Sequence, residues 1–166
     1  MLFVTLVLVV LALDRVTKII AIDQLTASGP IAFLPAFLDF ALVYNTGGAF
    51  GLFEGGGVLF VGVAAVAVIA IIVYLTRARQ LQVLLVITLS LISGGAIGNA
   101  YDRAVSGAVP DFIHTLFVEF PVFNVADMAL TLGEIALIII VAVHWFGPKK
   151  ELEEGKDKEE EWEEGD

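Results

Sequence analysis

The chain has 166 residues, 58% of them hydrophobic, and a mean hydropathy of +0.92. That composition is too apolar for an ordinary soluble domain, and the length is too short for a large transporter, so we expect one small integral membrane domain. The formal net charge of -10 is concentrated near the end of the chain, since the ten acids and four lysines after Gly147 contribute -6 and leave -4 for the rest.

We expect residues 1–147 to form the membrane domain. Residues 148–166 have the composition of a solvated, disordered cytoplasmic tail, to which we assign no catalytic role. Cysteine is absent from the sequence. This excludes disulfides, a thiol nucleophile and thiolate metal ligands.

Four apolar stretches each come close to the roughly 20 residues that a helix needs to cross a bilayer. They run over about Leu2–Ile22, Gly57–Leu75, Leu81–Tyr101 and Val125–Phe146. The first lacks the basic region and the small-residue cleavage site of a secretory signal, so we expect it to remain as a permanent span. Arg77 and Arg79 lie between the second and third stretches, and the positive-inside tendency places their loop and both termini in the cytoplasm.

The two longer connections, Asp23–Gly56 and Asp102–Asn124, are then extracytoplasmic. They hold nine of the twelve phenylalanines, which is typical of a surface at the membrane interface. Residues 38–44 alternate with the period of a strand, and residues 45–48 favour a turn. The predicted fold is therefore an integral membrane, mainly α protein with four transmembrane helices and a small extracytoplasmic β-sheet at the membrane surface.

Two carboxylates in the outer part of the chain, Asp111 and Asp127, are candidates for catalysis. Ionisable groups at membrane depth are costly and are functional-site hypotheses by default. Asp111 is expected in a short apolar loop, and Asp127 opens the fourth stretch three residues after Asn124. A capped helix start would by itself explain Asn124 and Asp127. Two neighbouring acids can also share a proton, which suits acid-base hydrolysis of a peptide bond.

Further polar residues accompany this pair. Asn99, Asp102 and Arg103 share one helix face after a glycine-rich run, and a packing motif with an interfacial cap is about as well favoured there as a functional role. Asp14 and Lys18 are four residues apart on the first stretch, where a structural ion pair is the preferred interpretation and support of the site the alternative.

The remaining acids outside the tail receive structural interpretations. Glu134 lies two turns beyond Asp127 on nearly the same face, and a buried structural acid is favoured there over a proton relay. The acids expected to be solvated in the loops are Asp23, Asp39, Glu54 and Glu119.

Other chemistries are poorly supplied. The only histidines are His114 and His144, too few for a multi-histidine metal site, and a serine triad is not easy to assemble. Five basic residues outside the tail do not make a nucleic-acid surface. The main alternative to a peptidase is a small proton-coupled membrane transporter subunit, which requires acids spread through the membrane depth. A third interpretation, a scaffold protein with loops at the membrane interface, does not explain why so many polar residues lie at the ends of the predicted helices.

Five blocks of sequence together resemble the bacterial lipoprotein signal peptidases, also called signal peptidase II. They are Asp14 with Lys18, residues 45–50 (NTGGAF), residues 94–103 (GGAIGNAYDR), residues 111–113 (DFI) and residues 123–127 (FNVAD). The blocks occur in the order of the family and cover the chain except its acidic tail. Arg15, Pro110, Met128 and Glu134 depart from the pattern that we associate with the family.

The resemblance implies a four-helix peptidase of the bacterial inner membrane, with its site near the outer face. The substrate would be a prolipoprotein cut just before its diacylglyceryl-modified cysteine, in contact with membrane lipid and with no nucleic acid, metal or cofactor; a monomer is favoured. Asp111 and Asp127 match the catalytic pair, a choice over Asp102 that rests on the resemblance alone. The matching supporting residues are Asp14, Lys18, Asn45, Gly47, Asn99, Asp102, Arg103 and Asn124. We further expect Asp127, near a helix N-terminus, to be the more readily ionised partner and Asp111 the more readily protonated.

Overall fold

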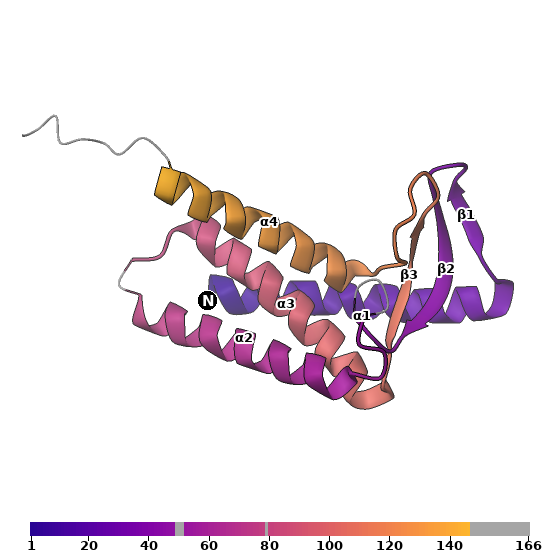
Figure 1. Cartoon of the computed structure of the whole chain (residues 1–166), viewed down its shortest axis with the longest axis horizontal. Helices are drawn as coiled ribbons and strands as arrows, with labels where there is room; N and C mark the ends of the chain where they lie inside the picture. Colours follow the sequence, from indigo (N-terminus) through magenta and orange to yellow (C-terminus); the bar gives the residue numbers. More distant parts are fainter. Residues whose placement is uncertain (49–51, 79, 147–166) are drawn as a thin grey trace, which may run out of the picture.

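The computed structural model describes residues 1–48, 52–78 and 80–146. Its elements are, in chain order, α1 (Leu2–Ser28), β1 (Ile31–Leu34), β2 (Leu38–Asn45), α2 (Gly57–Arg77), α3 (Val83–Ser106), β3 (Val109–Thr115) and α4 (Val125–Phe146). The helices lie alongside one another and the strands form a sheet at one end of them (Figure 1). The expected mainly helical fold with a small sheet is confirmed. The predicted tail falls outside the described residues.

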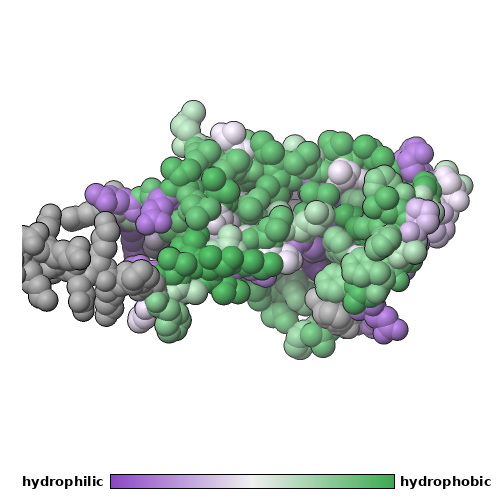
Figure 2. Space-filling view, turned by 90° about the horizontal axis from the view of Figure 1, so that it is seen from above, coloured by the Kyte–Doolittle hydropathy of each residue, from purple (hydrophilic) through white to green (hydrophobic). Residues whose placement is uncertain are grey.

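Among the described residues, three helices are long and apolar enough to cross a membrane: α2, α3 and α4. Helix α1 has 27 residues, a sufficient length, but Asp14, Arg15 and Lys18 interrupt its apolar sequence. Apolar residues cover most of the helical surface in the view of Figure 2, and hydrophilic residues gather mainly toward the two ends of the molecule. This distribution is the one expected of a protein that lies in a bilayer.

Helix α3 is the centre of the helical part, because it packs against each of the other three helices. Glycines permit these close contacts. A Cβ atom added to Gly94 would lie 2.7 Å from Cβ of Val10 on α1, and one added to Gly133 on α4 would lie 2.7 Å from Cγ1 of Ile92 on α3. Small residues of this kind let membrane helices approach closely, which fixes how α1 and α4 sit on α3.

The sheet is antiparallel with the order β1-β2-β3. The strand predicted over residues 38–44 is confirmed as β2. The predicted loop around Asp111 is wrong, because Asp111 lies on β3 and pairs with Val43 of β2. The backbone groups of β3 are satisfied by β2 and by a bridge from Ile113 to Phe123, so this segment crosses one end of the helices as a strand.

Helix α1 extends six residues beyond its predicted end at Ile22. The extra turns support the sheet, because Leu25 is buried together with Ala21 and with Phe112 of β3. Helix α3 likewise continues past its predicted end to Ser106. Gly107 then adopts a left-handed conformation, with φ of 75°, and its N–H bonds to the carbonyl of Arg103. This glycine ends the helix and turns the chain into β3.

Candidate active site

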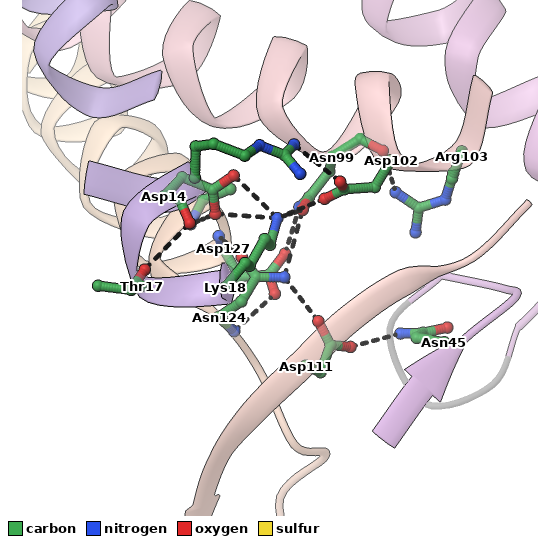
Figure 3. Close-up of polar contacts among 12 residues, drawn as sticks. Asp14, Thr17, Lys18, Asn45, Asn99, Asp102, Arg103, Asp111, Asn124 and Asp127 are labelled. Carbon is green, nitrogen blue, oxygen red and sulfur yellow. Dashed lines mark hydrogen bonds and ion pairs between the residues drawn. The ribbon is translucent and has the colours of Figure 1, made fainter. Parts of the chain in front are cut away.

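Asp111 and Asp127 are held together by Asn124, between β3 and the start of α4 (Figure 3). The Nδ2 group of Asn124 donates a hydrogen bond to Oδ1 of Asp111 at 2.6 Å. Its backbone N–H donates to Oδ2 of Asp127 at 3.0 Å. Asn124 is fully buried and Asp111 is 2% exposed. The strand therefore supplies one carboxylate, the helix supplies the other, and a single residue contacts both.

The start of α4 has the reciprocal hydrogen bonds of a capping box. The backbone N–H of Asp127 donates to Oδ1 of Asn124 at 3.0 Å, while the backbone N–H of Asn124 donates to the Asp127 carboxylate. The expected N-cap is thus present. Asn124 does more than cap the helix. Its Nδ2 group also donates hydrogen bonds to Asp111 and, at 3.2 Å, to Oδ1 of Asn99.

Asn99 of α3 connects Asp127 to a buried lysine. Its Nδ2 group donates to Oδ1 of Asp127 at 2.7 Å, and its Oδ1 atom accepts a hydrogen bond from Nζ of Lys18 at 3.1 Å. Lys18 is fully buried and also contacts Asp14 at 2.9 Å and Asp102 at 2.7 Å. All three donors of the ammonium group are therefore used, as a buried charge requires.

Asp14 and Asp102 close this network on opposite sides. Asp14, which is 1% exposed, accepts a hydrogen bond from the backbone N–H of Ala126 at 3.1 Å. Asp102 also pairs with Arg15, whose guanidinium lies over the ring of Tyr101 at 4.6 Å. Sequence reasoning noted Arg15 only as a departure from the family pattern. Its position next to Asp14 and one turn before Lys18 was the available signal.

Asn45 and Arg103 border the carboxylates on the side of the sheet. Nδ2 of Asn45 donates to Oδ2 of Asp111 at 3.0 Å, and Oδ1 of Asn45 accepts the N–H of Gly47 at 2.9 Å. Arg103 donates to the carbonyl of Gly47 at 2.6 Å and stacks over Phe60, and its buried Nε has no hydrogen-bond partner within the described part of the chain. All ten predicted site residues thus belong to one cluster; their individual roles remain predictions.

Asp111 lies at the boundary of two cavities. One, of about 480 Å³, is bordered by Arg103, Asp111 and Asp127 together with the side of α4. The other, of about 310 Å³, is bordered by Asp111 and the turn after β2. Within residues 1–48, 52–78 and 80–146, no group of three His, Asp or Glu side chains is arranged to hold a metal ion.

The surroundings of Asp111 raise the pKa of its carboxyl group from 3.8 to about 6. Burial is the largest cause, and the nearby charge of Asp127 acts in the same direction. Hydrogen bonds from Asn45 and Asn124 and the charge of Lys18 oppose the rise in pKa. With this pKa the group carries a proton in a larger fraction of molecules near neutral pH than an ordinary aspartic acid does, and such a proton is what a general acid supplies.

Comparison with known proteins identifies the family. Residues 6–143 match the family described as signal peptidase (SPase) II. The chain belongs to the signal peptidase II family. Among its relatives, the lipoprotein signal peptidase of Symbiobacterium thermophilum is 39% identical over 80% of this chain and 89% of its own length. That of Pseudomonas putida is 40% identical over 80% of this chain and 81% of its own length.

Solved structures of bacterial membrane enzymes share the fold of this chain. A bacterial membrane enzyme solved at 2.3 Å resolution superposes with a TM-score of 0.77 at 29% identity, covering 91% of this chain and 94% of its own. A second, solved at 1.9 Å, gives a TM-score of 0.71 at 30% identity, covering 84% of this chain and 91% of its own. The resemblance predicted from five short blocks is confirmed. The alternative of a transporter subunit receives no support.

Proposed function

We propose that this chain is an aspartic endopeptidase that removes the signal peptide from diacylglyceryl-modified prolipoproteins, cutting just before the lipid-modified cysteine. Membership of the signal peptidase II family supports the reaction, because relatives named lipoprotein signal peptidase match most of the chain. The observation that supports Asp111 and Asp127 as the catalytic pair is their shared contact with Asn124 at the edge of one cavity.

The two carboxylates would hydrolyse the peptide bond with one proton held between them. The ionised carboxylate takes a proton from a water molecule as the water oxygen attacks the carbonyl carbon, and the protonated carboxyl donates its proton to the carbonyl oxygen. In the second step the C–N bond breaks and the nitrogen receives a proton from the pair. The signal peptide leaves as a carboxylate, and the lipoprotein keeps an amino group on its lipid-modified cysteine.

We assign the proton of the free enzyme to Asp111. Its raised pKa supports this assignment, and so does the position of Asp127 in the first turn of α4, where the helix dipole favours a negative charge. The two groups titrate as a coupled pair, so the assignment concerns the dominant microstate. A neutron structure or an NMR titration of the free enzyme that places the proton on Asp127 would contradict it.

In the membrane, α1 would be the fourth transmembrane helix, with both termini cytoplasmic and the site near the outer face. The burial of Asp14 and Lys18, 1% and 0% exposed, supports this arrangement. Asp14 pairs with Lys18, and Lys18 also contacts Asp102 and Asn99, so neither charge faces lipid. Residues 1–147 would then form a single peptidase domain in contact with lipid, active as a monomer, and residues 148–166 a cytoplasmic tail.

The test is cleavage of a diacylglyceryl-modified prolipoprotein by the chain reconstituted in lipid vesicles. Wild type should release the signal peptide, whereas Asp111→Asn and Asp127→Asn should lose at least about three orders of magnitude in rate, as removal of an essential acid-base group does. Ile135→Leu, on the same helix but outside the cavity beside the carboxylates, serves as the control and should stay active. No cleavage by folded wild type, or full cleavage by either Asn variant, would overturn the proposal.

A further inference from the structure

Glu134 is an acidic side chain of α4 that the proposed reaction does not use. It lies seven residues after Asp127, which places it about 10 Å further along the helix axis. Glu134, Thr131 and Asp127 border the same cavity of about 480 Å³. Glu134 is exposed rather than packed, and no other residue of the described chain forms a hydrogen bond or ion pair with it. The predicted buried structural acid is therefore not what the structure shows.

The position of Glu134 is unusual for an acid. A second cavity, of about 760 Å³, lies between α2, α3 and α4 and is bordered by Leu137, Val141 and His144. These residues continue the face of α4 that carries Asp127 and Glu134. The two cavities thus follow one side of the helix away from the carboxylates, along mostly apolar walls. An unpaired carboxyl group in such a wall is costly unless something that binds there uses it.

A signal peptide bound along this wall would need hydrogen-bond donors near Glu134. The peptide must be extended where it meets the carboxylates, so its helix has to end before the scissile bond. The last four carbonyl groups of a helix have no partner within the helix, and hydrocarbon surroundings supply no water to replace one. An extended chain covers about 3.3 Å per residue, so a distance of about 10 Å places that helix end roughly three residues before the scissile bond.

We infer that the carboxyl group of Glu134 binds the free backbone carbonyls at the end of the signal-peptide helix as a hydrogen-bond donor. The C-terminal end of a helix carries partial negative charge, so an O–H donor fits there and a carboxylate does not. Thr131, one turn closer to Asp127, supplies a second donor on the same cavity wall. Glu134 is thus a specificity-determining residue that favours substrates whose helix ends at this depth. The inference rests on the proposed function of the site.

The ester groups of the substrate lipid offer the same acceptor chemistry, because each contains a carbonyl oxygen a few bonds beyond the cysteine sulfur. A substrate whose lipid is joined through ether bonds has no such carbonyl but keeps the peptide unchanged. Comparing the ester and ether substrates therefore separates the peptide backbone, which we assign as the acceptor, from the lipid.

The experiment measures kcat and KM for wild type, Glu134→Gln and Glu134→Leu in vesicles. Removing one net hydrogen bond with Glu134→Leu should lower kcat/KM by about 2- to 10-fold, mainly through KM, with both the ester and the ether substrate. Glu134→Gln keeps a donor of similar shape and should stay within about 2-fold of wild type. Ile135→Leu, the neighbouring residue outside both cavities, is the control for changes in this helix.

Three results would overturn the inference while leaving the peptidase itself established by wild-type cleavage: unchanged kinetics of Glu134→Leu, an equal loss with Glu134→Gln, or a loss that disappears with the ether substrate. An equal loss of kcat/KM with Glu134→Gln would mean that the substrate contacts the carboxylate anion of Glu134. A loss that disappears with the ether substrate would mean that the lipid ester is the acceptor. If wild type cleaves nothing, the proposed function fails first. Thermal unfolding of each variant should match wild type, since Glu134 has no partner in the described chain.

Discussion

Asn124 couples the two carboxylates because each polar group of its side chain has a partner. Its Oδ1 atom accepts from α4, and its Nδ2 group donates to Asp111 and Asn99. An amide is suited to this position, since it offers an acceptor to the helix and a donor to the acids, whereas a carboxylate would add a third negative charge without a donor. The geometry of the pair therefore depends on an amide at this position.

Replacing Asn45 with alanine should shift the pH profile of the enzyme. Asn45 donates a hydrogen bond to Asp111 at 3.0 Å, which stabilises the ionised carboxylate and lowers its pKa. Without this donor the pKa of Asp111 rises further above about 6. If Asp111 supplies the proton, activity is lost as the pH rises through that pKa, so the alkaline limb of kcat/KM should move up by about one pH unit.

A matched variant of the same strand is Asp39→Asn. Asp39 lies near the other end of β2 and pairs with His114 at 2.9 Å, away from the cavities that contain the carboxylates. The alkaline limb of the kcat/KM profile of Asp39→Asn should coincide with that of wild type. An Asn45→Ala limb that stays in place or moves to lower pH would contradict the assignment of the proton to Asp111.

The two cations that contact Asp102 should differ strongly in their effect on stability. Lys18→Met leaves the buried carboxylates of Asp14 and Asp102 without their shared cation, which should lower the free energy of unfolding by about 3–5 kcal/mol. Arg15→Gln removes a partner whose side chain is 38% exposed, and should cost about 1 kcal/mol or less. Unfolding in detergent measures both, and similar losses would contradict the network as described.

At this scale the sequence predicts contacts that are local. The pairing of Asp14 with Lys18 and the capping of α4 by Asn124 follow from spacings of three and four residues, and both are present. The contact between Lys18 and Asp102 spans 84 positions, and no local spacing indicates it. The packing of α1 on α3 creates that contact.

At the scale of the elements, the glycines of α3 should be sensitive to the addition of a methyl group. A Cβ atom on Gly95 would overlap the carbonyl oxygen of Ala126 and lie 2.8 Å from Cγ of Leu130, so Gly95→Ala must push α4 away from α3. We expect a loss of about 1–3 kcal/mol in stability. Activity should also fall, because the contact between Asn99 and Asp127 crosses this interface.

Gly62→Ala on α2 is the control for this change, since a Cβ atom there meets no atom within 4 Å. Alanine favours helix by up to about 1 kcal/mol over glycine, so this variant should be as stable as wild type or more stable. Thermal unfolding and cleavage rates measure both variants. Equal behaviour of the two would mean that the approach of α3 to α4 does not limit stability.

The strands show which elements sequence patterns can predict. Strand β2 alternates over residues 38–44 and was predicted, whereas β1 and β3 were not. The four residues of β1 are all apolar, and β3 contains Pro110 in its second position, so neither sequence has the alternation that indicates a strand. The last turns of α1 were missed for a related reason. Leu25 acquires its packing from Phe112, almost ninety positions away in the sequence.

At the scale of the whole molecule, the proposed orientation can be tested by labelling because the chain has no native cysteine. Gln80→Cys lies in the connection between α2 and α3, and Val118→Cys lies between β3 and α4, at a side chain that is 49% exposed. A membrane-impermeant maleimide should reach Val118→Cys from outside intact cells and Gln80→Cys only in inverted vesicles. The reverse pattern would contradict the cytoplasmic placement of both termini.

The polar cluster around Asp111 and Asp127 also has a simple charge sum. Its acids are Asp14, Asp102, Asp111 and Asp127, and its bases are Lys18 and Arg103 (Figure 3) together with Arg15, which pairs with Asp102. Four acids minus three bases leave one negative charge, and a single bound proton makes the cluster electrically neutral. Because a low-dielectric environment penalises net charge, neutrality favours one proton in the resting enzyme. The proton that hydrolysis requires is therefore already part of the charge balance of the fold.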